Sequence, residues 1–111
     1  MQNMFCGCTS LITIELSSFN IHKVNDMKYM FERCSSLSTL DLSSFSTQNL
    51  RNMCGMFTNC FSLIKVDLST FNTSNAFVIG IFCGCNKLSK YCSSDKNIIT
   101  QFNKKSDFSM K

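Results

Sequence analysis

The chain repeats itself with a period of roughly 25 residues, which lies in the range of solenoid repeats. The repeat is marked by a phenylalanine and by a cysteine that follows it three positions later. The two series are Phe5, Phe31, Phe57 and Phe82, and Cys8, Cys34, Cys60 and Cys85. A repeat of this length cannot bury its own apolar side chains, so neighbouring repeats must stack to share a core. The sequence therefore predicts a tandem repeat array.

Each repeat contains a segment in which apolar and polar residues alternate. In the second repeat it reads Leu37-x-x-Leu40-x-Leu42, and Val66-Asp67-Leu68 is its counterpart in the third. Period-two alternation predicts a half-buried β-strand. Because the same strand recurs one repeat later, neighbouring strands must pair in parallel and the chain must return across the opposite face.

The return segment carries apolar residues at three- and four-residue spacing, as at Leu50, Met53 and Met56. This spacing favours a short helix or a single turn that packs inward. The return segment 76–82 is one residue shorter, and we place the deletion near Gly80. We expect an α/β solenoid, a right-handed coil of about four repeats with a parallel sheet on one face and turns or short helices on the other.

The repeats start near residues 4, 30, 56 and 81, which makes residues 1–91 one repeat domain. Beyond Tyr91 the register weakens, so residues 92–111 are predicted to be a degenerate repeat or a basic tail. Apolar residues there are candidates for such a repeat or for a cap: Ile98, Ile99, Phe102 and Phe108. The whole surplus of the +4 net charge lies beyond Cys85. Because basic and aromatic residues are not interleaved there, this surplus of positive charge predicts a solvated end rather than a nucleic-acid-binding tail.

The length of 111 residues allows one small domain. No apolar run approaches the roughly 20 residues of a membrane-spanning helix. The first residues, Met1–Cys6, carry no signal-peptide pattern, so we expect either an intracellular protein or an excerpt from a longer chain.

The repeat also resembles a known family. Leu-x-x-Leu-Asp-Leu-Ser-Ser-Phe followed by Met-Phe-x-x-Cys-x-Ser-Leu is similar to the repeats of BspA-like leucine-rich-repeat surface proteins, including mycoplasma-type surface lipoproteins, over roughly residues 4–91. The resemblance implies a leucine-rich-repeat-like solenoid that is secreted or displayed on the cell surface, where it adheres to a protein or extracellular-matrix ligand. It implies a monomer or part of a longer array, and no catalytic residues.

One position departs from the usual leucine-rich repeat. Where such repeats carry an asparagine after the strand, this chain has Phe19, Phe45 and Phe71. We therefore expect stacked aromatic rings in place of an asparagine ladder.

The regular spacing of the cysteines favours buried, unpaired side chains over disulfides, because parallel side-chain vectors give poor bridge geometry. Metal or thiol-redox use is the alternative at Cys6-Gly7-Cys8 and Cys83-Gly84-Cys85, where the additional cysteine is taken to fill the position of Arg33 and Asn59. With His22 as the single histidine, we expect no metal and no cofactor. Cys54 and Cys92 lie outside the series and are the candidates for reactive thiols.

One polar strip along the predicted strands is the candidate ligand surface. Its acidic members occupy the same strand position in three repeats, and hydroxyl residues flank them: Glu15, Asp41 and Asp67, with Thr39, Ser43 and Ser69. The alternative is a merely solvated face, because adjacent like charges repel. Asn72-Thr73-Ser74 is a glycosylation sequon, which matters only in a eukaryotic secretory route, and a chance occurrence is the better explanation.

No set of residues with the pattern of a catalytic centre is present. The sequence thus predicts a non-enzymatic interaction module, with a structural spacer or a thiol or metal protein as alternatives.

Overall fold

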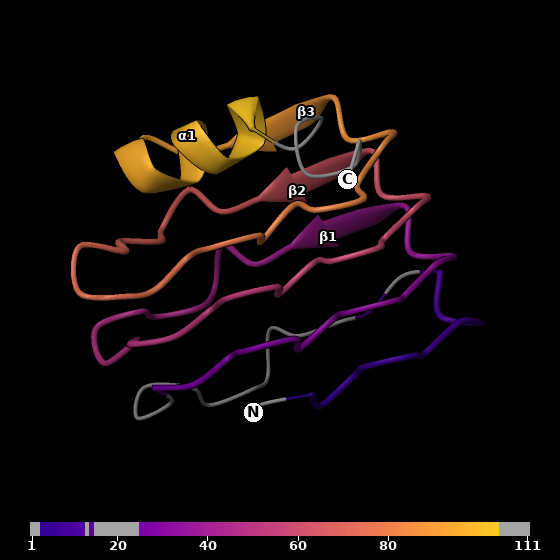
Figure 1. The fold of residues 1–111 in the computed structure, drawn as a ribbon, viewed down its shortest axis with the longest axis horizontal. Coiled ribbons are helices and arrows are strands. Elements are labelled where there is room, and N and C mark those ends of the chain that lie inside the picture. Colours follow the sequence, from indigo (N-terminus) through magenta and orange to yellow (C-terminus); the bar gives the residue numbers. More distant parts are fainter. Residues whose placement is uncertain (1–2, 13, 15–24, 105–111) are drawn as a thin grey trace.

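The computed structural model describes residues 3–12, 14 and 25–104. It contains three short strands and one helix: β1 (Thr39–Asp41), β2 (Lys65–Asp67), β3 (Lys90–Cys92) and α1 (Lys96–Asn103). The strands lie side by side in chain order, and α1 follows β3 at one end of the molecule (Figure 1). No helix among the described residues is long and apolar enough to span a bilayer.

The strands form one parallel sheet. Leu40 pairs with Val66, and Val66 pairs in turn with Tyr91. The side chains of Leu40 and Val66 are buried, whereas their neighbours along each strand point away from the core. The predicted parallel pairing of equivalent strands is therefore confirmed for these three repeats.

The return segments are built from turns rather than helices, and they too bond to one another. Isolated parallel bridges join Asp26 to Asn52 and Asn52 to Phe77. Phe31 donates its backbone N–H to the Met56 carbonyl at 2.9 Å, and Phe57 donates to the Ile81 carbonyl at 3.0 Å. Backbone hydrogen bonds thus join successive repeats on both sides of the core.

These turns require a left-handed backbone at two positions in each repeat. Positive φ occurs at Asn3, Tyr29, Gly55 and Gly80, and again at Gly7, Arg33, Asn59 and Gly84. At two of these positions the preceding repeat also leaves no space: a Cβ on Gly55 would overlap the Tyr29 ring, and one on Gly84 would overlap the Asn59 side chain. Glycine fits at both positions because it tolerates positive φ and has no Cβ to overlap its neighbour.

The deletion lies earlier in the chain than Gly80. Leu50 and Ala76 occupy equivalent places, since each donates its N–H to the carbonyl three residues back, at Thr47 and Thr73. Both pairs keep the full spacing that separates Phe31 from Phe57, but Asn52 is bridged to Phe77, which is one position short of that spacing. The missing residue is therefore the counterpart of Arg51, and the predicted position near Gly80 was wrong.

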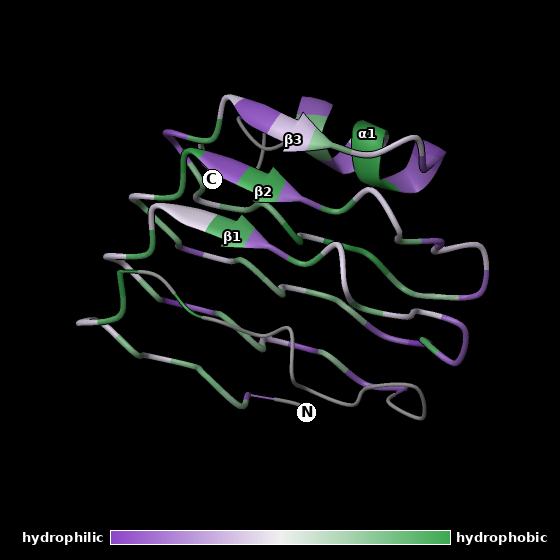
Figure 2. Cartoon of the chain, turned by 180° about the vertical axis from the view of Figure 1, so that it is seen from behind, coloured by the Kyte–Doolittle hydropathy of each residue, from purple (hydrophilic) through white to green (hydrophobic). Residues whose placement is uncertain are grey.

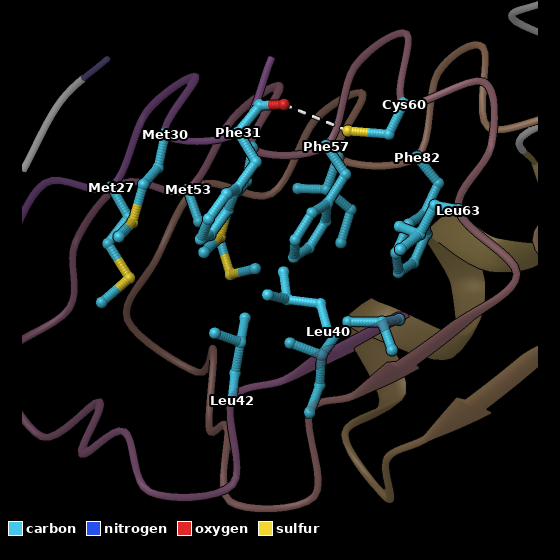
Figure 3. Packing of buried hydrophobic residues seen from close by; sticks show 14 of the residues in the cluster. Met27, Met30, Phe31, Leu40, Leu42, Met53, Phe57, Cys60, Leu63 and Phe82 are labelled. Carbon is cyan, nitrogen blue, oxygen red and sulfur yellow. Dashed lines mark hydrogen bonds between the residues drawn. The ribbon is translucent and has the colours of Figure 1, made fainter. Parts of the chain in front are cut away.

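A column of phenylalanine rings forms the centre of the core. The rings of Phe5, Phe31, Phe57 and Phe82 stack with centroid separations of 5.4, 5.8 and 5.8 Å and interplanar angles of 6–10°. Buried methionines flank the rings on one side and strand leucines face them (Figure 3). Phe45 and Phe71 are also buried, but no ring contact joins these two residues, so the stacked aromatics occur at another position than the one expected.

Helix α1 closes one end of the column. Phe102 places its ring edge-on against Phe82 at 6.2 Å, and Ile98 is fully buried. The predicted boundary after residue 91 falls inside β3, and Phe108 lies outside the described residues. Of the two roles considered for the apolar residues of this segment, a degenerate repeat or a cap, the described residues fit a cap.

Asp95 anchors the cap. Its carboxylate accepts the N–H groups of Asn97 and Ile98, as an N-cap residue does, and also the N–H and hydroxyl of Thr73 at 2.7 Å each. Partial burial raises the pKa of Asp95, but the hydrogen bonds from Thr73, Ile98 and Asn97 together lower it below its usual value. The stabilisation is thus present at neutral pH and is lost as the pH falls through the folded pKa.

Replacing Phe57 by alanine should destabilise the fold by about 3–5 kcal/mol, because it removes a fully buried ring from the middle of the column. Urea unfolding measures the change. Phe61→Ala is the matched control, since Phe61 is 48% exposed and should cost less than about 1 kcal/mol. Equal losses at the two positions would contradict the stacked core.

Asp95→Ala should cost about 1–2 kcal/mol of folding stability at neutral pH, because it removes the helix cap and leaves the hydroxyl proton of Thr73 without its acceptor. The difference between this variant and the native chain should shrink as the pH falls through the lowered pKa of the folded carboxylate. Thermal unfolding over an acid pH series measures this. Lys96→Ala, at the exposed start of α1, is the control, and a pH-independent loss in Asp95→Ala would argue against the carboxylate.

Candidate functional site

The predicted acidic strip lies on the outer face of the sheet. Asp41 and Asp67 are direct neighbours in the parallel register at the ends of β1 and β2. Asp41 Oδ1 accepts the N–H and the hydroxyl of Ser43 at 2.9 and 2.6 Å, and Asp67 Oδ1 accepts the N–H of Ser69 at 2.9 Å. Each aspartate therefore also turns the chain at the end of its strand.

Charge on this face is arranged in two rows of opposite sign. Lys65 and Lys90 are neighbours at the start of β2 and β3, two positions before the aspartate row. Neighbouring strands are about 4.8 Å apart, so like charges adjoin within each row. The hydroxyl and N–H of Ser43, with a smaller contribution from Lys65, lower the pKa of Asp41 and keep it ionised. Figure 2 shows the hydrophilic ends of β2 on either side of its apolar centre.

A shallow hollow of about 290 Å³ lies between the rows. It is lined by Thr39, Leu40, Asp41, Lys65 and Asp67. Three predicted ligand residues, Thr39, Asp41 and Asp67, come together here, whereas Ser43 and Ser69 do not line the hollow and Glu15 lies outside the described residues. Lys65, which pairs with Thr39 in the strand register, completes the lining.

The cysteine series has a local structural role that spacing does not reveal. Cys34, Cys60 and Cys85 are buried, and each thiol donates to the carbonyl of a phenylalanine in the preceding repeat. Cys60 Sγ lies 3.1 Å from the Phe31 oxygen. Figure 3 draws this hydrogen bond as a dashed line. Cys8, in the first repeat, is only half-buried.

Burial raises the pKa of Cys34 to about 11 and raises that of Cys60 further. All eight cysteines are thiols, and the described residues bring together no group of three or more His, Cys, Asp or Glu that could hold a metal ion. Cys54 is half-buried and Cys92 is exposed.

The assignment of the paired cysteines needs a correction. The repeat positions of Arg33 and Asn59 are filled by Gly7 and Gly84, all four with positive φ, so the additional cysteine does not occupy them. Cys6 and Cys83 instead correspond to Glu32 and Thr58: Gly7 bonds to the Glu32 carbonyl, and Asn59 to that of Cys83. The turn geometry therefore explains why glycine separates each pair.

Raising the pH from about 8 to about 10 should lower the free energy of unfolding. Unfolded thiols ionise near pH 9.0, whereas Cys34 in the folded chain stays protonated to about pH 11, so stability present below pH 9 is lost between these values. Each such thiol lowers the free energy of unfolding by about 1.4 kcal/mol for each pH unit between its unfolded and its folded pKa. Urea unfolding at both pH values measures the slope.

Cys34→Ser retains a hydrogen-bond donor but does not ionise in this range, so it should show a smaller slope. Cys92→Ser, at an exposed thiol, should keep the native slope. Identical slopes in the two variants would contradict the buried-thiol interpretation.

A second hollow, which the sequence did not indicate, lies at the edge of the molecule between residues 45–51 and 70–75. It includes Asn72 of the sequon, whose Oδ1 accepts the N–H of Ser74.

Comparison with known proteins places the chain in a family. No curated protein and no solved structure matches it. One family model, described as "Mycoplasma protein of unknown function, DUF285", matches residues 1–94 and so covers all the repeats. The chain belongs to this family.

Proposed function

We propose that this protein is a non-enzymatic interaction module of the BspA-like leucine-rich-repeat type. It acts at the cell surface or as a secreted protein, and binds a protein or extracellular-matrix partner through the outer face of β1, β2 and β3. The observation that carries the proposal is the hollow on that face, which is flanked by an acidic and a basic row.

The proposed architecture is a right-handed, leucine-rich-repeat-like solenoid. It is supported by the parallel pairing of β1 to β3, by the bridges between return segments and by the continuous phenylalanine column. All three features recur at the spacing of one repeat. In such arrays the exposed sheet is a usual binding surface.

The two rows determine the kind of partner. Asp41 and Asp67 attract cationic side chains, while Lys65 and Lys90 attract anionic ones two positions away along the strands. A partner surface that carries both charges in the matching order gains affinity and orientation. Because Asp41, Lys65 and Lys90 are exposed to solvent, binding should weaken at high ionic strength.

A binding role fits this face better than catalysis does. Acid–base catalysis needs paired groups whose environments push their pKa values apart. Asp41 and Asp67 occupy equivalent places and each accepts the N–H of the serine two residues on. Because the two carboxylates have similar hydrogen-bond partners, they fit a repeated contact surface better than an acid–base pair.

The test is a double variant, Asp41→Asn with Asp67→Asn. Asparagine keeps the Oδ1 acceptor that holds each turn, so the fold is retained while both charges are removed. Binding of labelled protein to wells coated with basement-membrane extract should fall at least about tenfold, since each lost charge contact contributes on the order of 1 kcal/mol.

Asp26→Asn is the matched control. Asp26 accepts the N–H of Lys28 in the same kind of turn but lies in the return segments, on the other side of the core. It should bind like the native protein. Unchanged binding in the double variant, or no binding by the native protein, would favour the alternative of a structural spacer within a longer surface protein.

A thiol or metal function has less support. Cys34, Cys60 and Cys85 use their thiols to bond the phenylalanine carbonyls of the core.

A further inference from the structure

The second hollow lies where the repeat is interrupted. It has a volume of about 370 Å³ and lies between two successive loops, 45–51 and 70–75. Up to Ala76 these loops match residue for residue, but the counterpart of Arg51 is missing from the second loop. The hollow therefore combines Arg51 with the shortened loop, a juxtaposition that the regular repeat does not produce.

The hollow is rich in hydrogen-bonding groups and carries a single charge. None of its ten lining residues is acidic, and Arg51 is the one basic residue among them. Arg51 Nη1 donates to the Leu50 carbonyl at 3.1 Å, which holds the guanidinium against its own loop and leaves further N–H donors available.

The neutral lining groups are hydroxyls and amides. The Thr70 hydroxyl donates to the Phe45 carbonyl at 2.9 Å, so its oxygen remains an acceptor at the wall. The side chains of Gln48 and Asn75 line the hollow and bond to no other described residue. Amides of this kind both donate and accept, as a ligand with several hydroxyl groups requires.

We propose that this hollow binds the carboxylate-bearing sugar unit of an acidic saccharide. The guanidinium of Arg51 pairs with the carboxylate, and the amides and hydroxyls around it bond the sugar hydroxyls. The volume is near the lower end of the range for small-molecule sites, which suits one sugar unit. The site is separate from the sheet face and does not depend on the function proposed for it.

Glucuronate is the probe, titrated into isotope-labelled protein and followed by amide chemical shifts. Saturable shifts are expected in the loops 45–51 and 70–75, and Arg51→Gln should weaken binding at least about tenfold, the equivalent of a lost charge-assisted bond. Asn75→Asp should weaken binding as well, since it places a negative charge in the lining. Thermal unfolding verifies that both variants keep the native fold.

Lys87→Gln is the matched control, because it removes an exposed positive charge outside the hollow and should leave the affinity unchanged. Glucose, acetate and inorganic phosphate are the comparison ligands. Glucose should bind at least about tenfold more weakly, because it lacks the carboxylate. Absent glucuronate binding, equal losses in Arg51→Gln and Lys87→Gln, or acetate or phosphate binding as tight as glucuronate would each overturn the proposal.

Discussion

The backbone hydrogen bonds between successive repeats govern the rest of this structure. One set pairs the three strands, and a second joins the return segments, as from Phe31 to Met56. Because these bonds link one repeat to the next in register, the described residues of the strands and return segments lie beside their counterparts. The molecule is therefore assembled from contacts between like residues, and the value of each contact depends on what kind of residue recurs.

For apolar and neutral residues, contact between like positions is favourable. Phe31, Phe57 and Phe82 stack face to face, and a cysteine thiol bonds the phenylalanine carbonyl of the preceding repeat. For charged residues the same rule is costly, since it places Asp41 beside Asp67 and Lys65 beside Lys90. The aspartates offset part of this cost through their turn hydrogen bonds, and the uncompensated charge is the feature on which the proposed binding role rests.

The most individual features of the molecule arise where repetition stops. At one end, α1 replaces a further repeat and covers Phe82 with the edge of Phe102 instead of a parallel ring. Within the array, the loss of one residue opposite Arg51 interrupts the match between neighbouring loops, at the hollow proposed to bind a sugar acid. Uniform repeats supply stability, and their interruptions supply the local features that occur once.

The sequence by itself determined the repeat, the parallel pairing of Leu40 with Val66 and the burial of Cys34 and Cys60. Each of these follows from the regular spacing of equivalent residues along the chain. It also placed Thr39, Asp41 and Asp67 on one face, since alternation along a strand fixes which side chains point outward. Only the tertiary structure decided that glycine rather than cysteine holds the left-handed turn positions, that the cysteine thiols bond to Phe carbonyls, and that Arg51 faces a shortened loop. These features depend on backbone torsion angles and on contacts across repeats, and residue spacing along the chain specifies neither.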